Sequence, residues 1–149
     1  MEKEIKKKLA SNWFKLLQNI ICSDIEKLEN KKIKFKSKTW KKNKIKDEGG
    51  GEFRILKNGK IFEKVGVNFS EVYGKFSKEM VGKIPGANKN PNFWASGISV
   101  VMHMNNPYIP AIHFNTRFIY TTHGWFGGGM DVTPCIIDNK EKDQDVRES

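Results

Sequence analysis

The sequence predicts an α+β fold, in which an N-terminal amphipathic helix packs on a mainly antiparallel β-sheet. From Glu2 to Glu29, apolar residues recur at three- and four-residue steps. Later segments alternate apolar and polar residues between short turns rich in Gly, Asn and Pro. The length of 149 residues suits one domain. We expect a helix over 1–30, a sheet-rich region over 31–135 and a charged tail over 136–149.

The helix carries an apolar stripe, which we expect to face the sheet. Such a stripe is typical of a helix that covers a core. Its members are Ile5, Leu9, Trp13, Leu16, Leu17, Ile20, Ile21, Ile25 and Leu28. The lysines on the other side of the helix are expected to face solvent.

The first strands follow the helix. Lysine alternates with other residues from Lys32 to Thr39, which predicts a strand with its charge on one face. Two further strands, 53–57 and 60–73, flank Asn58-Gly59. This dipeptide predicts a tight hairpin turn with positive φ at both central residues.

The second half of the sheet-rich region contains two more predicted strands. They span 93–103 and 111–121, with a turn-rich connection between them. Downstream, Gly127-Gly128-Gly129 allows tight backbone bends and close approach of a bulky ligand. The run lacks the Lys-Ser/Thr of a phosphate loop.

Composition excludes several protein classes. No apolar stretch reaches the roughly 20 residues of a membrane span, and no signal segment is evident, so we expect a cytoplasmic protein. Cys22 and Cys135 are too far apart to suggest a disulfide framework or a zinc knuckle. Asn68-Phe69-Ser70 matches the glycosylation acceptor pattern, which we attribute to chance in such a chain.

The net charge of +10 comes mainly from lysines in the N-terminal third. Only three of the 27 basic residues are arginine, the side chain best suited to grip phosphates and bases. A compositional preference for lysine explains the charge as well as a binding role does. A basic RNA-binding module is therefore an alternative, and the weakest one.

One polar face carries the candidate chemistry. Period two places His113, Asn115 and Arg117 on one face of their strand, and Ser99 and His103 on one face of the preceding strand. An antiparallel pairing about residue 108 would bring His103 near His113 and Ser99 near Arg117. Arginine clamps carboxylates, the amide both donates and accepts, and the imidazole titrates.

Such a face suits a substrate that bears carboxylates. A solvent-facing strand, with polar residues that serve solubility alone, explains the same alternation. A metal site formed by His103, His113 and His123 is a third possibility, although their spacing is not a known ligand pattern.

Several motifs together resemble a known family, the oxygen-dependent coproporphyrinogen III oxidases. The resemblance covers about residues 38–134, in the family's order. It rests on Glu48-Gly49-Gly50-Gly51, the segments 65–70 and 97–103, Asn106-Pro107, the segment 113–117, and Trp125-Phe126-Gly127-Gly128-Gly129-Met130-Asp131-Val132-Thr133-Pro134.

The resemblance implies a reaction in haem biosynthesis. Two propionates of coproporphyrinogen III would be decarboxylated oxidatively to vinyl groups, which gives protoporphyrinogen IX. O2 would be the oxidant, and no flavin, haem or nicotinamide is implied. The polar face of the strands agrees with such a substrate, because a positive groove with Arg117 would attract a multiply anionic molecule.

The resemblance also assigns roles to residues. His113 would be the proton donor, and Asp131 would face the pyrrole N–H groups. His103 and His113 match positions assigned in the family to a divalent metal, although the family's reaction needs no cofactor. Contacts with the substrate would come from Ser99, Asn115, Thr116 and Arg117.

The chain also departs from the family. Family members form homodimers and continue well beyond this length, with further substrate contacts and the dimerisation segment in their second half. We therefore expect an N-terminal half of the enzyme, a truncated fold with reduced or no activity. The main alternative is a non-catalytic fragment that binds an anionic tetrapyrrole.

Overall fold

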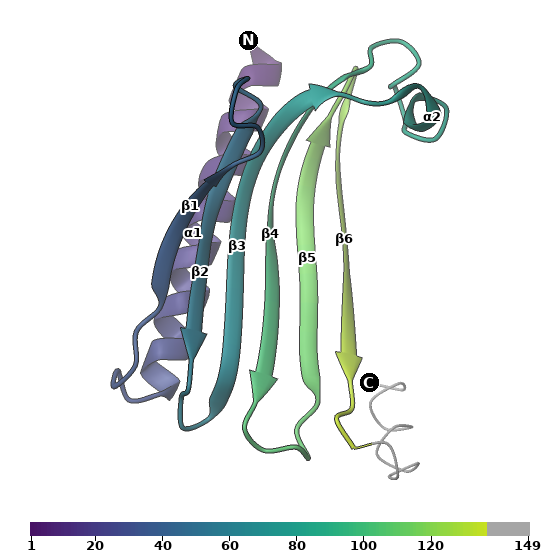
Figure 1. Cartoon of the computed structure of the whole chain (residues 1–149). Coiled ribbons are helices and arrows are strands. Elements are labelled where there is room, and N and C mark those ends of the chain that lie inside the picture. The colour runs from purple at the N-terminus through teal and green to yellow at the C-terminus, as the bar shows by residue number, and fades with distance from the viewer. Residues whose placement is uncertain (137–149) are drawn as a thin grey trace.

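The computed structural model describes residues 1–136 and contains one sheet with one long helix beside it (Figure 1). All but the first residue of the predicted tail, 136–149, lies outside the described residues. The elements are α1 (Glu2–Leu28), β1 (Lys36–Lys41), β2 (Gly49–Lys57), β3 (Phe62–Lys75), α2 (Lys78–Val81), β4 (Asn92–Met104), β5 (Ala111–Tyr120) and β6 (Gly124–Thr133).

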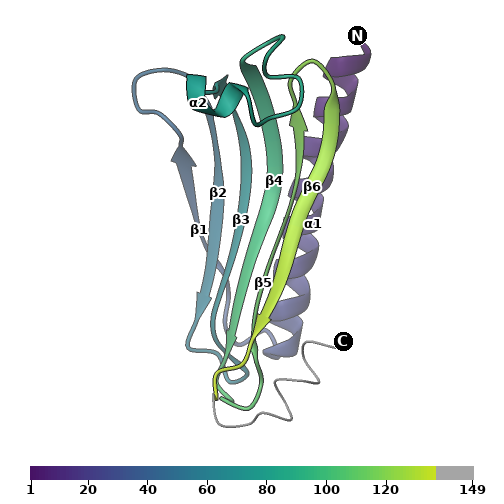
Figure 2. The ribbon, with the colours of Figure 1, turned by 90° about the vertical axis from the view of Figure 1, so that its right-hand side faces the viewer.

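The six strands lie side by side in sequence order, and every pair is antiparallel. Helix α1 runs along one face of the sheet (Figure 2). This confirms the predicted α+β class with an antiparallel sheet and an N-terminal helix. Within residues 1–136, no helix combines the length and the apolar character needed to cross a bilayer.

Strand β6 was not expected from the sequence. The glycine run 127–129 allows tight bends, but here it is extended and pairs with residues 115–117 of β5. Glycine disfavours strands because it loses much entropy and offers no side chain to pack. Pairing with β5 overrides this local preference.

The β2–β3 turn also differs from the predicted Asn58-Gly59 turn. Asn58 has a positive φ of 58°, as predicted, but the φ of Gly59 is not positive. The Gly59 N–H donates to Phe62 O at 2.8 Å, so the turn spans 59–62. The carboxylate of Glu29, at the end of α1, accepts hydrogen bonds from the N–H groups of Lys60, Ile61 and Phe62, each at 2.7 Å.

The face that α1 turns to the sheet matches the predicted stripe only in part, because Leu17 and Ile21 pack against the core and Ile25 is buried. The residues buried on α1 are Ala10, Ser11, Phe14, Gln18, Cys22 and Ile25. Of the predicted stripe only Ile25 is among them, while Ile5, Leu9, Trp13, Leu16 and Ile20 are 43–65% exposed.

The helical period of 3.6 explains this outcome, because it sets these exposed residues opposite Phe14 and Gln18. The helix therefore has an apolar stripe on each side. The side against the sheet includes small residues such as Ala10 and Cys22, which permit close approach, and Gln18, whose NH2 group donates to the sheet backbone.

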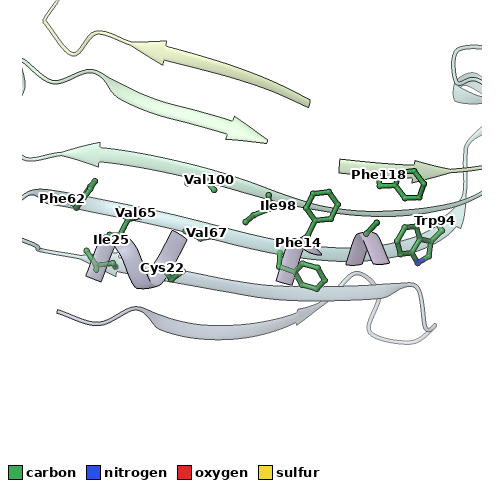
Figure 3. Packing of buried hydrophobic residues seen from close by; sticks show 13 residues of the cluster. Phe14, Cys22, Ile25, Phe62, Val65, Val67, Trp94, Ile98, Val100 and Phe118 are labelled. Atoms are coloured by element: carbon green, nitrogen blue, oxygen red, sulfur yellow. The ribbon is translucent and has the colours of Figure 1, made fainter. Parts of the chain in front are cut away.

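The core lies between α1 and the near face of the sheet (Figure 3). Leu56, Val65, Val67 and Val100 are fully buried, and Phe14 is 1% exposed. The buried Gln18 side chain donates through Nε2 to Glu52 O at 2.9 Å and to Val67 O at 3.1 Å. Helix α1 is thus held on the sheet by apolar packing together with the hydrogen bonds of Gln18 to β2 and β3.

Candidate functional site

The predicted polar face is the sheet face that points away from α1, called the open face from here on. His113, Asn115 and Arg117 share it with Ser99, as strand parity predicted. The register differs by two residues from the predicted pairing about residue 108. Ser99 faces Asn115, and Gly97 faces Arg117. Each side chain stays on its predicted face because the register shift is an even number of residues.

Strand β6 adds Asp131 directly opposite His113. Its Oδ1 lies 3.2 Å from His113 Nδ1, and its Oδ2 accepts a hydrogen bond from the Thr133 hydroxyl at 3.1 Å. The side chains of His113 and Asp131 are 46% and 61% exposed. A carboxylate beside Nδ1 favours the proton on that nitrogen, and Nε2 is the ring nitrogen that Asp131 does not engage.

Arg117 and Asn115 form a second pair on the same strand. Arg117 Nη2 donates to Asn115 Oδ1 at 2.9 Å. This contact engages the amide oxygen and leaves the Asn115 NH2 group as a donor. Arg117 is exposed, so the rest of its guanidinium is accessible from solution.

Two other predicted site residues behave differently. Thr116 lies on the α1 side of the sheet, since it alternates with Asn115 and Arg117, and its side chain does not join the open face. His103 is on the open face, beyond Val101 along β4. It is not opposite His113, whose partner on β4 is Val101.

The donors present make an incomplete metal site. Among residues 1–136, no three His, Cys, Asp or Glu side chains cluster in a way that could hold a metal ion. His113 and Asp131 contact each other, and His103 is not grouped with them. The described residues therefore do not fit the divalent metal implied by the resemblance.

Small residues form the middle of the open face. The row of cross-strand partners through Arg117 contains Trp40, Gly51, Ser70, Gly97, Arg117 and Gly127. Between Trp40 on β1 and Arg117 on β5 this row has no side chain larger than serine. A bulky ligand can therefore approach the backbone there.

Sequence reasoning missed one polar residue of this face. Asn68 on β3 faces Ser99 on β4, which in turn faces Asn115 on β5. We call Asn68, Ser99 and Asn115 the polar row. The signal was present in the shared parity of the three strands, but only the register across β3 and β4 brings Asn68 into line.

Comparison with known proteins agrees with the motifs. A sequence model of the family described as Coproporphyrinogen III oxidase matches residues 9–145. Oxygen-dependent coproporphyrinogen-III oxidase from Rickettsia felis is 47% identical over 136 residues, which are 86% of this chain and 47% of that protein. The enzyme of that name from Rickettsia akari is 44% identical over 146 residues, 93% of this chain and 51% of that protein. The chain thus spans about half the length of the curated relatives it matches.

Proposed function

The chain belongs to the coproporphyrinogen III oxidase family, and we propose that its open face binds coproporphyrinogen III for oxidative decarboxylation by O2. The relatives are about twice as long, so we assign substrate binding to this chain first and turnover second. One observation carries the proposal. Two polar pairs, Arg117–Asn115 and His113–Asp131, lie on the open face, next to a row of small residues.

Substrate recognition follows from charge. The substrate bears four propionates, and the guanidinium of Arg117 offers a planar two-donor fork for one carboxylate. Asn115 holds this guanidinium from the side at 2.9 Å, which limits its rotation. Lys36 and Lys38, which share the open face on β1, add positive charge that attracts an anionic ligand.

The reaction requires one proton for each propionate. A hydride equivalent leaves the carbon next to the pyrrole ring, the C–COO− bonding pair becomes the new double bond, and CO2 departs. O2 takes up the hydride with one proton and becomes hydrogen peroxide. His113 would supply that proton from Nε2, while Asp131 at Nδ1 orients the ring.

Asp131 has a second proposed role. Its carboxylate is exposed on the open face and retains accepting capacity beside His113 and Thr133. Pyrrole N–H groups are donors, so the macrocycle centre is proposed to lie over this carboxylate. Ser99 and Asn115 would then contact the periphery of the substrate.

The first experiment measures binding. Fluorescence titration of the chain with coproporphyrin III, the stable oxidised form, should show saturable binding. The tetramethyl ester, which lacks the carboxylates, should bind at least about tenfold more weakly, because charge-assisted hydrogen bonds are lost. Equal affinity for acid and ester, or no binding, would contradict the proposal. Preferential, steeply salt-dependent binding to RNA would favour the nucleic-acid alternative.

The second experiment separates binding from chemistry. Coproporphyrinogen is prepared anaerobically, and protoporphyrin fluorescence is followed after admission of air. His113→Ala should lower turnover more than affinity, since a proton donor acts in the transition state. Equal losses would make His113 a binding residue. Tetrapyrrole binding without detectable turnover by the unmodified chain would support the non-catalytic alternative.

A further inference from the structure

We infer that Asn68, held in place by Trp40, is a further substrate-binding residue that donates a hydrogen bond to a propionate other than the one that Arg117 clamps. This inference rests on the proposed function, because it assigns a second carboxylate contact to the same open face. Asn68 belongs to the segment Asn68-Phe69-Ser70, to which the preceding sections give no function.

The position of Asn68 follows from the register. Asn68 pairs with Ser99 across β3 and β4, and Ser99 pairs with Asn115 across β4 and β5. All three side chains are half-buried and point to the open face. Adjacent strands are about 4.8 Å apart, so Asn68 and Asn115 are separated by roughly 10 Å across β4.

Trp40 determines which end of the Asn68 amide is available. Its indole Nε1 donates to Asn68 Oδ1 at 2.9 Å. An indole N–H is only a donor, so it must meet the amide oxygen. The NH2 group of Asn68 is therefore the end left for a ligand, and this group can only donate.

Gly51 makes this contact possible. Trp40 is on β1 and Asn68 is on β3, so the indole must cross β2 to reach the amide. Gly51, the partner of Trp40, is at the crossing point. A Cβ there would be 2.9 Å from Trp40 Cζ2 and would also collide with the carbonyl oxygen of Phe69. Gly51, the last glycine of the run 49–51, thus leaves the space through which the Trp40 indole reaches Asn68.

The two ends of the polar row are built alike. At one end the indole of Trp40 engages the oxygen of Asn68, and at the other the guanidinium of Arg117 engages the oxygen of Asn115. Each amide consequently presents its NH2 group, with the Ser99 hydroxyl between them. A row of donors with no carboxylate in it suits an anion that has several separated carboxylates.

The charge around Asn68 agrees with this assignment. Its partner on β2 is Phe53, whose own partner on β1 is Lys38. The row therefore continues from the amide across an apolar ring to a lysine. This composition suits a ligand with an apolar body and an anionic arm.

The decisive variant is Asn68→Asp. Aspartate keeps an oxygen acceptor for the Trp40 indole, so the β1–β3 contact is preserved, but it replaces the donor NH2 with an anionic oxygen. Affinity for coproporphyrin III, measured by fluorescence titration, should fall about tenfold or more, because a charge-assisted hydrogen bond is replaced by repulsion. Trp40→Phe keeps an aromatic ring and frees the amide to rotate, so a smaller loss of roughly threefold is expected.

The control is Asn12→Asp, the same chemical change on the exposed side of α1, beyond the other face of the sheet. It should leave the affinity unchanged. Unchanged affinity in Asn68→Asp, with Arg117 variants still weakened, would overturn this inference and leave the proposed function standing. A lowered melting temperature with unchanged affinity would make Asn68 a purely structural residue. Failure of the unmodified chain to bind coproporphyrin III would contradict the proposed function and this inference together.

Discussion

The two faces of the sheet are built on different principles. On the α1 side the strands contribute residues such as Val65, Val67 and Val100, which are inaccessible to solvent. On the open face the middle strands carry the polar row and the small residues beside it, and His113 and Arg117 are exposed. Stability is therefore concentrated on one face and the candidate chemistry on the other.

This difference between the faces predicts which substitutions change stability and which change ligand affinity. A change on the α1 side should lower the free energy of unfolding, whereas a change on the open face should alter ligand affinity and leave unfolding nearly unaffected. Successive residues of a strand alternate between the two faces, so neighbouring positions can have opposite consequences. The following variants test this separation.

The largest effect is expected for Phe14→Ala. The ring is 1% exposed against the sheet, and removing it leaves a cavity that costs about 3–5 kcal/mol of unfolding free energy. Denaturant unfolding followed by circular dichroism measures the loss. Trp13→Ala, at the preceding residue, which is 52% exposed, is the control and should cost much less. Equal losses would contradict the assignment of the buried helix face.

The next effect concerns Glu29. Burial raises the pKa of this carboxyl, but the N–H groups of Phe62, Ile61 and Lys60 lower it more, so the pKa is below its ordinary value. The stabilisation is then present above the ordinary value of about 4.3 and is lost as pH falls through the lower folded-state pKa.

Glu29→Gln should therefore lower the free energy of unfolding at pH 7 by about 1–3 kcal/mol, because the hydrogen bonds that the turn donates to a charged carboxylate are weakened. The difference from the unmodified chain should shrink as the pH is lowered below 4. Urea unfolding at several pH values measures both. Glu63→Gln, on an exposed side chain of the same hairpin, is the control. A difference that is independent of pH would contradict the role of the charge.

A smaller free-energy effect is expected on the open face. Arg117→Lys keeps the charge but loses the planar fork, so affinity for coproporphyrin III should fall about tenfold. The melting temperature should not change, since Arg117 is exposed. Arg54→Lys makes the same change on the α1 side, where Arg54 pairs with Glu52 at 2.6 Å, and should preserve affinity. Loss of affinity in both variants would show that the faces are not independent.

The last test perturbs the protein least. Burial raises the pKa of the Cys22 thiol to about 11, despite the nearby Arg54, whereas Cys135 is exposed. Iodoacetamide at pH 8 should alkylate Cys135 first and reach Cys22 only after denaturation, because the thiolate is the reactive form. Mass spectrometry of the digested protein reports the order. Early modification of Cys22 would contradict the described packing of α1.

The predictable parts of the structure are those that depend on period two. The open face, with His113, Asn115 and Arg117 together, followed from alternation alone. The pairing of Ser99 with Asn115 did not, because alternation fixes which face a residue occupies and leaves shifts of two residues equivalent. The geometry of the connection between β4 and β5 decides the register, and its sequence did not specify that geometry.

The missed parts depend on distant partners. The helix offered two apolar stripes, and only the sheet determines which of them is buried. Strand β6 has a glycine run that disfavours an extended element by itself, yet it brings Asp131 to His113. The contacts of Glu29 with 60–62 and of Trp40 with Asn68 join segments about thirty residues apart, which no local pattern reveals.

The sequential order of the strands has a kinetic consequence. Each of the five pairings joins neighbours along the chain, so each can form with closure of a single connecting segment. By contrast, α1 packs mainly on β3 and β4, which follow it by dozens of residues. Low contact order speeds folding. The hairpins should therefore assemble early, and docking of α1 should complete the transition, with substitutions at Phe14 accelerating unfolding more than they slow folding.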